Sequence, residues 1–100
     1  GRGASGEAMI DEVIDLARAN GDRRTVIEGL RRQAMFAWER GDVSTCEHLA
    51  NEGLVSATGS ELDECRAGIL VVLTAVQGER GQLAAATSGL AEAEAFLSRA

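Results

Sequence analysis

LRRQAMFAWERGDVSTCEHLANEGL, residues 30–54, has the pattern of two helices joined by a two-residue Gly-Asp corner. Gly41 can end a helix without a Cβ clash, and Asp42 can accept hydrogen bonds from the free N–H groups of the next helix. A corner this short makes consecutive helices antiparallel neighbours. Small residues stand where two such helices must touch: Ala34, Ala37, Cys46, Ala50 and Gly53. The segment therefore predicts a closely packed helical hairpin.

Working outward, glycines recur at positions 21, 41, 59 and 81, and each closes a segment of helical length. Asp22, Asp42 and Ser60 follow three of these glycines and are good helix N-caps. Ser60 to Asp63 is also close to a capping box, with Asp in place of the usual Glu. The expected helices cover residues 7–20, 23–40, 43–57, 61–80 and 82–98. Residues 1–6 are expected to form a flexible lead.

Each expected helix carries apolar residues at helical spacing. Met9, Ile10, Val13, Ile14 and Ala17 form this stripe in residues 7–20. The stripe of residues 82–98 consists of Leu83, Ala86, Leu90, Ala93 and Leu97. Residues 61–80 differ, because apolar side chains cover nearly the whole circumference around Ile69 to Val76. Such a helix must be covered on several sides, so it is either central in the packing or faces another partner.

An internal repeat becomes visible when Gly41 is aligned with Gly81. Leu30 then aligns with Leu70, and Ala50 with Leu90, at a period of 40 residues. Two hairpins follow, at residues 23–57 and 61–98. The helix at residues 7–20 would be the second half of an earlier hairpin, and the chain would then be a fragment of something larger.

The hairpin resembles a tetratricopeptide (TPR) repeat. Leu30, Ala34, Gly41-Asp42, Cys46, Ala50 and Gly53 occupy the positions of that pattern, although Ala37 replaces the usual aromatic residue and no proline closes the unit. The resemblance implies an all-α domain over residues 7–100, in which five helices form stacked antiparallel hairpins of a right-handed α-solenoid.

The resemblance extends to the C-terminal helical arrays of large bacterial regulators, the LuxR-type and related signal-transduction ATPases. It rests on Ile14 to Arg18 before Gly21-Asp22 and on the small residues around Gly41 and Gly81. It implies a protein-interaction scaffold, the TPR-like part of a bacterial transcriptional regulator. The G-x-x-x-x-G-K-[ST] motif of the ATPase core is absent, so only the array would be represented.

The composition limits which kinds of partner the chain is expected to bind. Nucleic-acid binding needs a cationic surface, so a net charge of −6 argues against direct nucleic-acid binding by this segment. The longest apolar run, residues 69–76, is too short to cross a bilayer, so no membrane partner is expected. Two cysteines on apolar helix faces do not make a disulfide framework, which favours a reducing cytoplasm.

The sequence offers little chemistry for catalysis. His48 and Cys46 are two residues apart and fall on different helix faces, which is poor placement for a metal site. Cys46 and Cys65 are expected to act as small buried hydrophobic residues. The arginines at 23, 24, 31 and 32 are expected to form a solvated helix face. We therefore expect no enzyme, metal or cofactor.

The expected binding site is a concave groove lined by the first helix of each hairpin. An aromatic residue, an adaptable Met and an Arg on one line are typical of a binding hot spot. An alternative role for Trp38 is simple packing between helices. The proposed groove residues are Glu28, Arg31, Met35, Trp38, Glu39, Val71 and Ala75.

Three functions are compatible with these features. The first is a scaffold that binds a protein or peptide, with possible self-association through exposed repeat ends. The second is an array that senses a small molecule or peptide in the groove. The third is a structural bundle without a groove, in which the first helix would close against the fifth.

Overall fold

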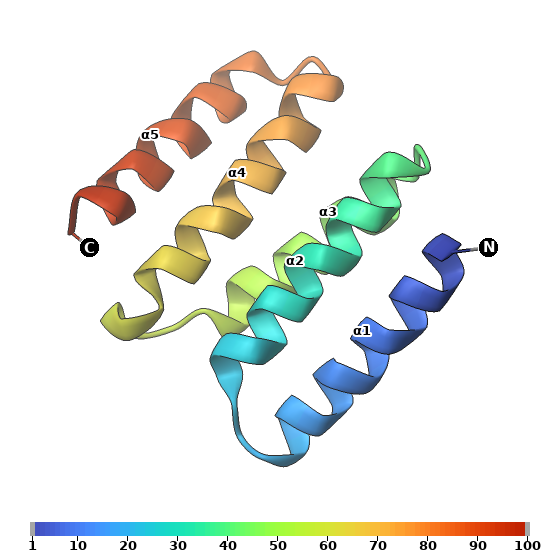
Figure 1. Cartoon of the computed structure of the whole chain (residues 1–100). Helices are drawn as coiled ribbons and strands as arrows, with labels where there is room; N and C mark the ends of the chain where they lie inside the picture. The colour runs from blue at the N-terminus through green and yellow to red at the C-terminus, as the bar shows by residue number, and fades with distance from the viewer. Residues whose placement is uncertain (1, 100) are drawn as a thin grey trace.

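The computed structural model describes the backbone of residues 2–99 and the side chains of residues 6–98, except those of residues 60, 83 and 84. Within this part of the chain all regular structure is helical, which confirms the predicted class (Figure 1). The helices are α1 (Arg2–Ala19), α2 (Arg23–Glu39), α3 (Val43–Ser56), the short 3₁₀ helix η1 (Ser60–Leu62), α4 (Asp63–Glu79) and α5 (Leu83–Arg99).

Two helix starts differ from the sequence prediction. Helix α1 begins at Arg2, so residues 2–6 are helical where a flexible lead was expected. Gly6 is accommodated there because the Phe36 ring of α2 lies against it, 3.3 Å from where a Cβ would be. Helix α4 begins at Asp63 after η1, and its N-cap is Leu62 without a side-chain hydrogen bond. The helix thus begins three residues after Ser60, and the side chain of Ser60, on which the predicted cap and capping box depend, lies outside the described residues.

The corners at Gly21, Gly41 and Gly81 share one geometry. All three glycines have positive φ, at 70°, 80° and 73°. At the first two corners the next residue is the predicted N-cap: Asp22 accepts from the Thr25 amide and Asp42 from the Thr45 amide. Hydrogen bonds from the Thr side chains and amides hold the pKa of both carboxyls below the usual value. The chain therefore reverses direction with its helix ends satisfied.

The helices pack as neighbours in chain order, and α2 also contacts α4. Helices α1 and α5 lie at opposite ends of the assembly (Figure 1). The extents are 35 × 31 × 17 Å, which describe a flat slab. The bundle alternative expected α1 to close against α5, and this arrangement does not do so.

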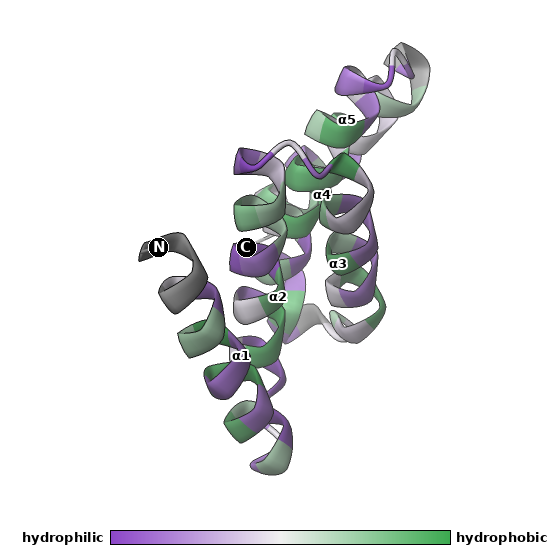
Figure 2. Cartoon of the chain, turned by 90° about the vertical axis from the view of Figure 1, so that its right-hand side faces the viewer, coloured by the Kyte–Doolittle hydropathy of each residue, from purple (hydrophilic) through white to green (hydrophobic). Residues whose placement is uncertain are grey.

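The main hydrophobic core lies among α2, α3 and α4, as the green segments in Figure 2 indicate. The small residues predicted at the hairpin contact are all buried there: Ala34, Ala37, Cys46, Ala50 and Gly53. Helix α4 contacts α2, α3 and α5, which makes it the central helix that its all-round apolar surface predicted. A second, smaller cluster joins α1 to α2 through Ile14, Ala17, Val26 and Leu30.

Two predicted apolar stripes are only half covered. On α1, Met9 and Val13 are exposed, together with Leu16. On α5, Leu90 and Leu97 are exposed, while Ala93 is buried. Both helices have a packing neighbour on one side only, which explains why half of each stripe meets solvent. The side chain of Leu83, also assigned to the α5 stripe, lies outside the described residues.

Glycines let the helices approach closely at two contacts. Ile14 of α1 packs on Gly29 of α2, where an added Cβ would lie 2.4 Å from Ile14 Cγ1. Ile69 of α4 packs on Gly53 of α3, at 3.0 Å from the corresponding position. An isoleucine side chain thus fills the space beside a glycine in each of these two helix pairs.

Two ion pairs recur at the same interval. Arg40, which caps α2, pairs with Glu7 of α1 at 2.7 Å, and Arg80, which caps α4, pairs with Glu47 of α3 at 2.7 Å. In both cases the arginine at the end of one helix binds a glutamate of the preceding helix.

Candidate functional site

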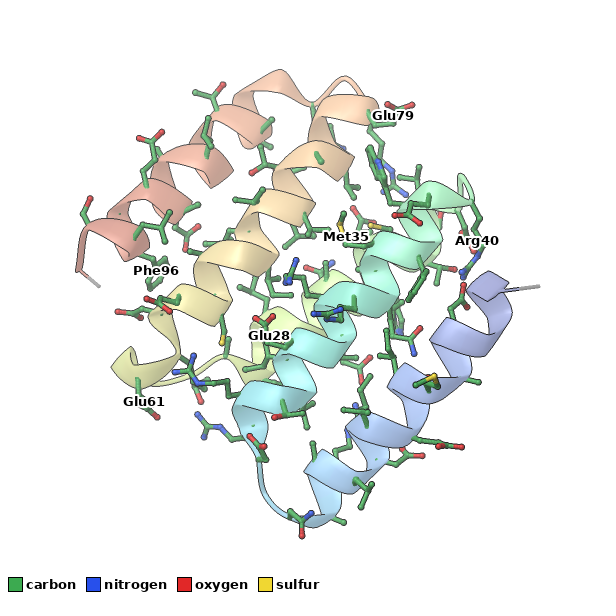
Figure 3. The ribbon with its side chains drawn as sticks, viewed as in Figure 1. Glu28, Met35, Arg40, Glu61, Glu79 and Phe96 are labelled. Carbon is green, nitrogen blue, oxygen red and sulfur yellow. The ribbon has the colours of Figure 1, made fainter. Side chains whose placement is uncertain are left out.

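The predicted groove residues of α2 include two that Figure 3 shows along the edge of that helix nearest α4. Glu28 and Met35 follow this edge (Figure 3). Arg31 pairs with Glu28 at 3.2 Å, and its Cδ lies 3.4 Å from where a Cβ on Gly68 of α4 would be. The absence of a side chain at Gly68 therefore lets the arginine stem cross to α4, while its charge is engaged by Glu28.

The apolar part of this surface is exposed on both helices. Met35 of α2 is 40% exposed and Val71 of α4 is 51% exposed. Ala75 and Glu39 are exposed as well. We call Met35, Val71 and Ala75, with the flanking charges of Glu28, Arg31 and Glu39, the α2–α4 surface.

Trp38 does not belong to the open part of this surface. It is half-buried and packs against the main core among α2, α3 and α4. This contact agrees with the alternative considered for Trp38, packing between helices, although the ring remains partly exposed.

A small hollow adjoins the surface on α2. It is lined by Arg32, Met35, Phe36 and Glu39 and has a volume of about 160 Å³. Drug-sized ligands usually occupy pockets of roughly 300–1,000 Å³. The hollow is thus large enough for one side chain and too small for most cofactors. Sequence reasoning missed Phe36, since its role depends on α1 lying beside it.

A larger hollow lies away from the predicted groove. It has a volume of about 370 Å³ and sits between the α1–α2 corner and the end of α3. Its charged groups already have partners in the protein: Arg18 pairs with Glu52 at 2.9 Å, and Arg23 donates to the Thr58 carbonyl. These bonds join helix ends, so we interpret the hollow as a structural joint. It could not be found from sequence, because its walls come from three separate segments.

The arginine cluster of α2 is divided between two roles. Arg23 and Arg24 donate to backbone carbonyls of the α3–α4 connection, with Arg24 2.6 Å from the Glu61 oxygen. Arg31 pairs with Glu28, while Arg32 is exposed. Arg23 and Arg24 are exposed, as the predicted solvated face requires, but their carbonyl partners in the distant α3–α4 connection were not predicted.

The cysteines are buried and the histidine is not. Cys46 is fully buried and Cys65 nearly so, which confirms their predicted packing role, and both are free thiols. Burial is the main cause that raises the pKa of each thiol above 9.0. His48 is exposed on another face of α3. Among the described residues, no three His, Cys, Asp or Glu side chains are grouped to hold a metal ion.

Comparisons of this chain with protein-family models, with curated proteins and with solved structures find no match. A search of the described residues for a helix long and apolar enough to cross a membrane also finds none.

Proposed function

We propose that this chain is a protein-interaction module of TPR-like architecture, whose α2–α4 surface binds a peptide or protein segment. The observation that carries the proposal is the pair of exposed apolar side chains, Met35 and Val71, on two neighbouring helices, with charges beside them. Methionine adapts to different partners, and a short apolar strip with charged edges suits an amphipathic peptide.

The TPR-like arrangement is supported by three features. The two helices of each hairpin are antiparallel and joined by a short corner (Figure 1). The first helices of the two hairpins, α2 and α4, contact each other, as the concave side of such a stack requires. The Glu7–Arg40 and Glu47–Arg80 ion pairs recur with the 40-residue period found in the sequence.

The other two functions have less support. The small volume of the hollow beside Met35 speaks against a small-molecule sensor at this surface. The separation of α1 from α5 speaks against a closed structural bundle (Figure 1). A place within a bacterial transcriptional regulator follows only from the resemblance, and the cytoplasmic location only from the cysteine content. Its test is the parent reading frame, which should encode an ATPase core upstream.

The binding surface can be tested with displayed peptides. A library of random 15-residue peptides is selected on the chain, and the selected peptides are measured by titration. Met35→Asp and Val71→Asp should each weaken binding about tenfold or more, because a charge replaces an apolar contact at the centre of the interface. Helical content measured by circular dichroism should stay unchanged, since both side chains are exposed.

Val55→Asp is the matched control. Val55 is an exposed apolar residue of α3 outside the α2–α4 surface. Its substitution should leave peptide binding unchanged. If Val55→Asp weakens binding as much as Met35→Asp, or if neither groove variant has an effect, the α2–α4 surface is not the binding site.

A further inference from the structure

The outer face of α1 presents an apolar stripe to solvent. Met9 is 67% exposed and Leu16 is 64% exposed, and Val13 lies between them at 47%. Their spacing of four and three residues places them on one side of the helix. The other half of the same apolar face, Ile10 and Ile14, packs against the cluster that α1 shares with α2. We call Met9, Val13 and Leu16 the α1 outer face.

The fold itself shows what covers a face of this kind. At the 40-residue interval of the recurring ion pairs, Met9 corresponds to Leu49 of α3, and Val13 to Gly53. In α3 both positions contact α2, and Gly53 also contacts Ile69 of α4. Leu49 packs on the cluster that contains Leu30, and Leu30 Cβ is 3.7 Å from where a Cβ on Gly53 would be. Leu49 and Gly53 of α3 are therefore covered by α2, whereas the equivalent residues of α1, Met9 and Val13, are exposed to solvent.

The charges of the helices agree with this correspondence. Helix α2 carries four arginines and two glutamates, whereas α3 carries two glutamates and no arginine. Helix α1 is likewise acidic, with four acidic residues and two arginines. Glu12 is one turn from both Met9 and Leu16, so a carboxylate borders the stripe. In α3 both glutamates pair with arginines of neighbouring helices, Glu47 with Arg80 of α4 and Glu52 with Arg18 of α1. Glu12 is the equivalent of Glu52 at the 40-residue interval, so an arginine of a covering helix is its expected partner.

The same acidic border disfavours a second copy of this chain. In an antiparallel two-fold pair of α1 helices, equivalent borders lie on the same side of the seam. The exposed Glu12 side chains, with Asp15 one turn further, would face their own copies. Like charges placed together across an interface oppose association.

We propose that the α1 outer face binds a basic amphipathic helix of a partner protein. The partner helix supplies apolar residues at spacings of three and four, which pack on Met9, Val13 and Leu16. Its Arg or Lys side chains lie beside Glu12. This surface is separate from the α2–α4 surface and does not depend on peptide binding there.

The probe is a synthetic peptide of residues 22–40 of this chain, DRRTVIEGLRRQAMFAWER, which has the required pattern and charge. It is labelled with a fluorophore and titrated with the full chain, and binding is followed by anisotropy. A scrambled peptide of the same composition is the reference. We expect saturable binding of the native peptide only, weakening as salt is raised because exposed charges are screened.

Variants then locate the site. Leu16→Asp should weaken binding about tenfold or more, because it places a charge in the apolar contact. Glu12→Arg should weaken binding less and should also reduce its salt dependence. Leu97→Asp changes another exposed leucine, on α5, and should leave binding unchanged, as should Met35→Asp. The unchanged Met35 variant separates this site from the α2–α4 surface.

Three results would overturn the proposal. The first is equal binding of the native and scrambled peptides, or no binding of either. The second is native-peptide binding that Leu16→Asp does not weaken, which would mean that the peptide binds elsewhere, for example by displacing α2. The third is a chain dimer in sedimentation experiments that Leu16→Asp dissociates, because a second copy would then occupy the face.

Discussion

The side chain of Arg66 in α4 contacts both the end of α3 and α5. Its guanidinium donates to the carbonyls of Leu54 and Ala57 at the end of α3, at 3.4 and 3.3 Å. It also pairs with Glu92 of α5 at 3.9 Å and lies 5.2 Å from the centre of the Phe96 ring. An arginine can satisfy all these partners because its planar fork offers five donors and a face for stacking.

Gln77 of α4 is the opposite case, a polar group that the fold does not satisfy. Its Oε1 atom is buried and has no hydrogen-bond partner in the described part of the chain. It lies near Gly89 of α5, 3.5 Å from where a Cβ would be. A buried acceptor without a partner costs about 1–3 kcal/mol of desolvation.

Replacing this side chain by an apolar one of similar length should stabilise the protein. Gln77→Met should raise the free energy of unfolding by about 0.5–1.5 kcal/mol in urea titrations, because the unsatisfied acceptor is removed at nearly constant volume. Gln82→Met makes the same chemical change at an exposed position of the α4–α5 corner and should stay within about 0.5 kcal/mol of the parent. A loss of stability in Gln77→Met would show that Oε1 is satisfied after all.

At the scale of the helices, glycine residues have two different structural roles. Gly29 is buried in the middle of α2 and receives Ile14, whereas Gly78 lies near the end of α4, where an added Cβ would have nothing within 4 Å. The first glycine is required by packing between α1 and α2. The second only lowers the helix propensity of α4.

Alanine substitutions at Gly29 and Gly78 should distinguish these two roles by opposite effects on stability. Gly29→Ala should destabilise the protein by about 1–3 kcal/mol, because the new Cβ overlaps Ile14 and forces α1 away from α2. Gly78→Ala should instead stabilise it by up to about 1 kcal/mol through helix propensity. Both changes in the free energy of unfolding are to be measured by thermal or urea unfolding. Equal stabilisation by the two alanines would mean that the close α1–α2 contact is absent in solution.

At the scale of the whole molecule, the chain forms a flat slab with one main core and two open ends. The core among α2, α3 and α4 contains both thiols, Cys46 and Cys65. Helices α1 and α5 each cover one side of it and expose their own outer apolar residues. Stability is therefore concentrated in the centre, and surfaces available for association lie at the ends and across α2 and α4.

The buried thiols predict how stability depends on alkaline pH. Burial raises the pKa of Cys46 and Cys65 above 9.0 in the folded chain, so the unfolded chain ionises first. The thiol contribution is fully present below the unfolded pKa and is lost as pH rises through the folded pKa. Unfolding titrations from about pH 9 upward should therefore show falling stability, since the ordinary thiol pKa is 9.0.

The Cys46→Ala, Cys65→Ala double variant is the control for this dependence. It lacks both thiols, so its stability should fall less over the same pH range, although it is less stable overall. In the parent, alkylation of the thiols should be slow until denaturant is added, because buried cysteines are poorly reactive. Rapid alkylation of the native chain, or identical alkaline slopes, would contradict the buried thiols.

The sequence by itself determined the helices and most of their ends. Gly41 and Asp42 act through local sterics and local hydrogen bonds, so their effect is readable without a neighbour. The small residues around them also indicated where two helices touch. The start of α4 was misjudged because η1 precedes it.

Only the tertiary structure decided which side of each apolar stripe is covered. Helical spacing places Val13 beside Ile14 on one apolar face, yet Ile14 fits the gap at Gly29 while Val13 meets solvent. In the same way, Arg24 carries the same charge as Arg32 but binds a carbonyl of the α3–α4 connection. Burial and pairing depend on what the neighbouring helices present at each position, and that information lies far away in the chain.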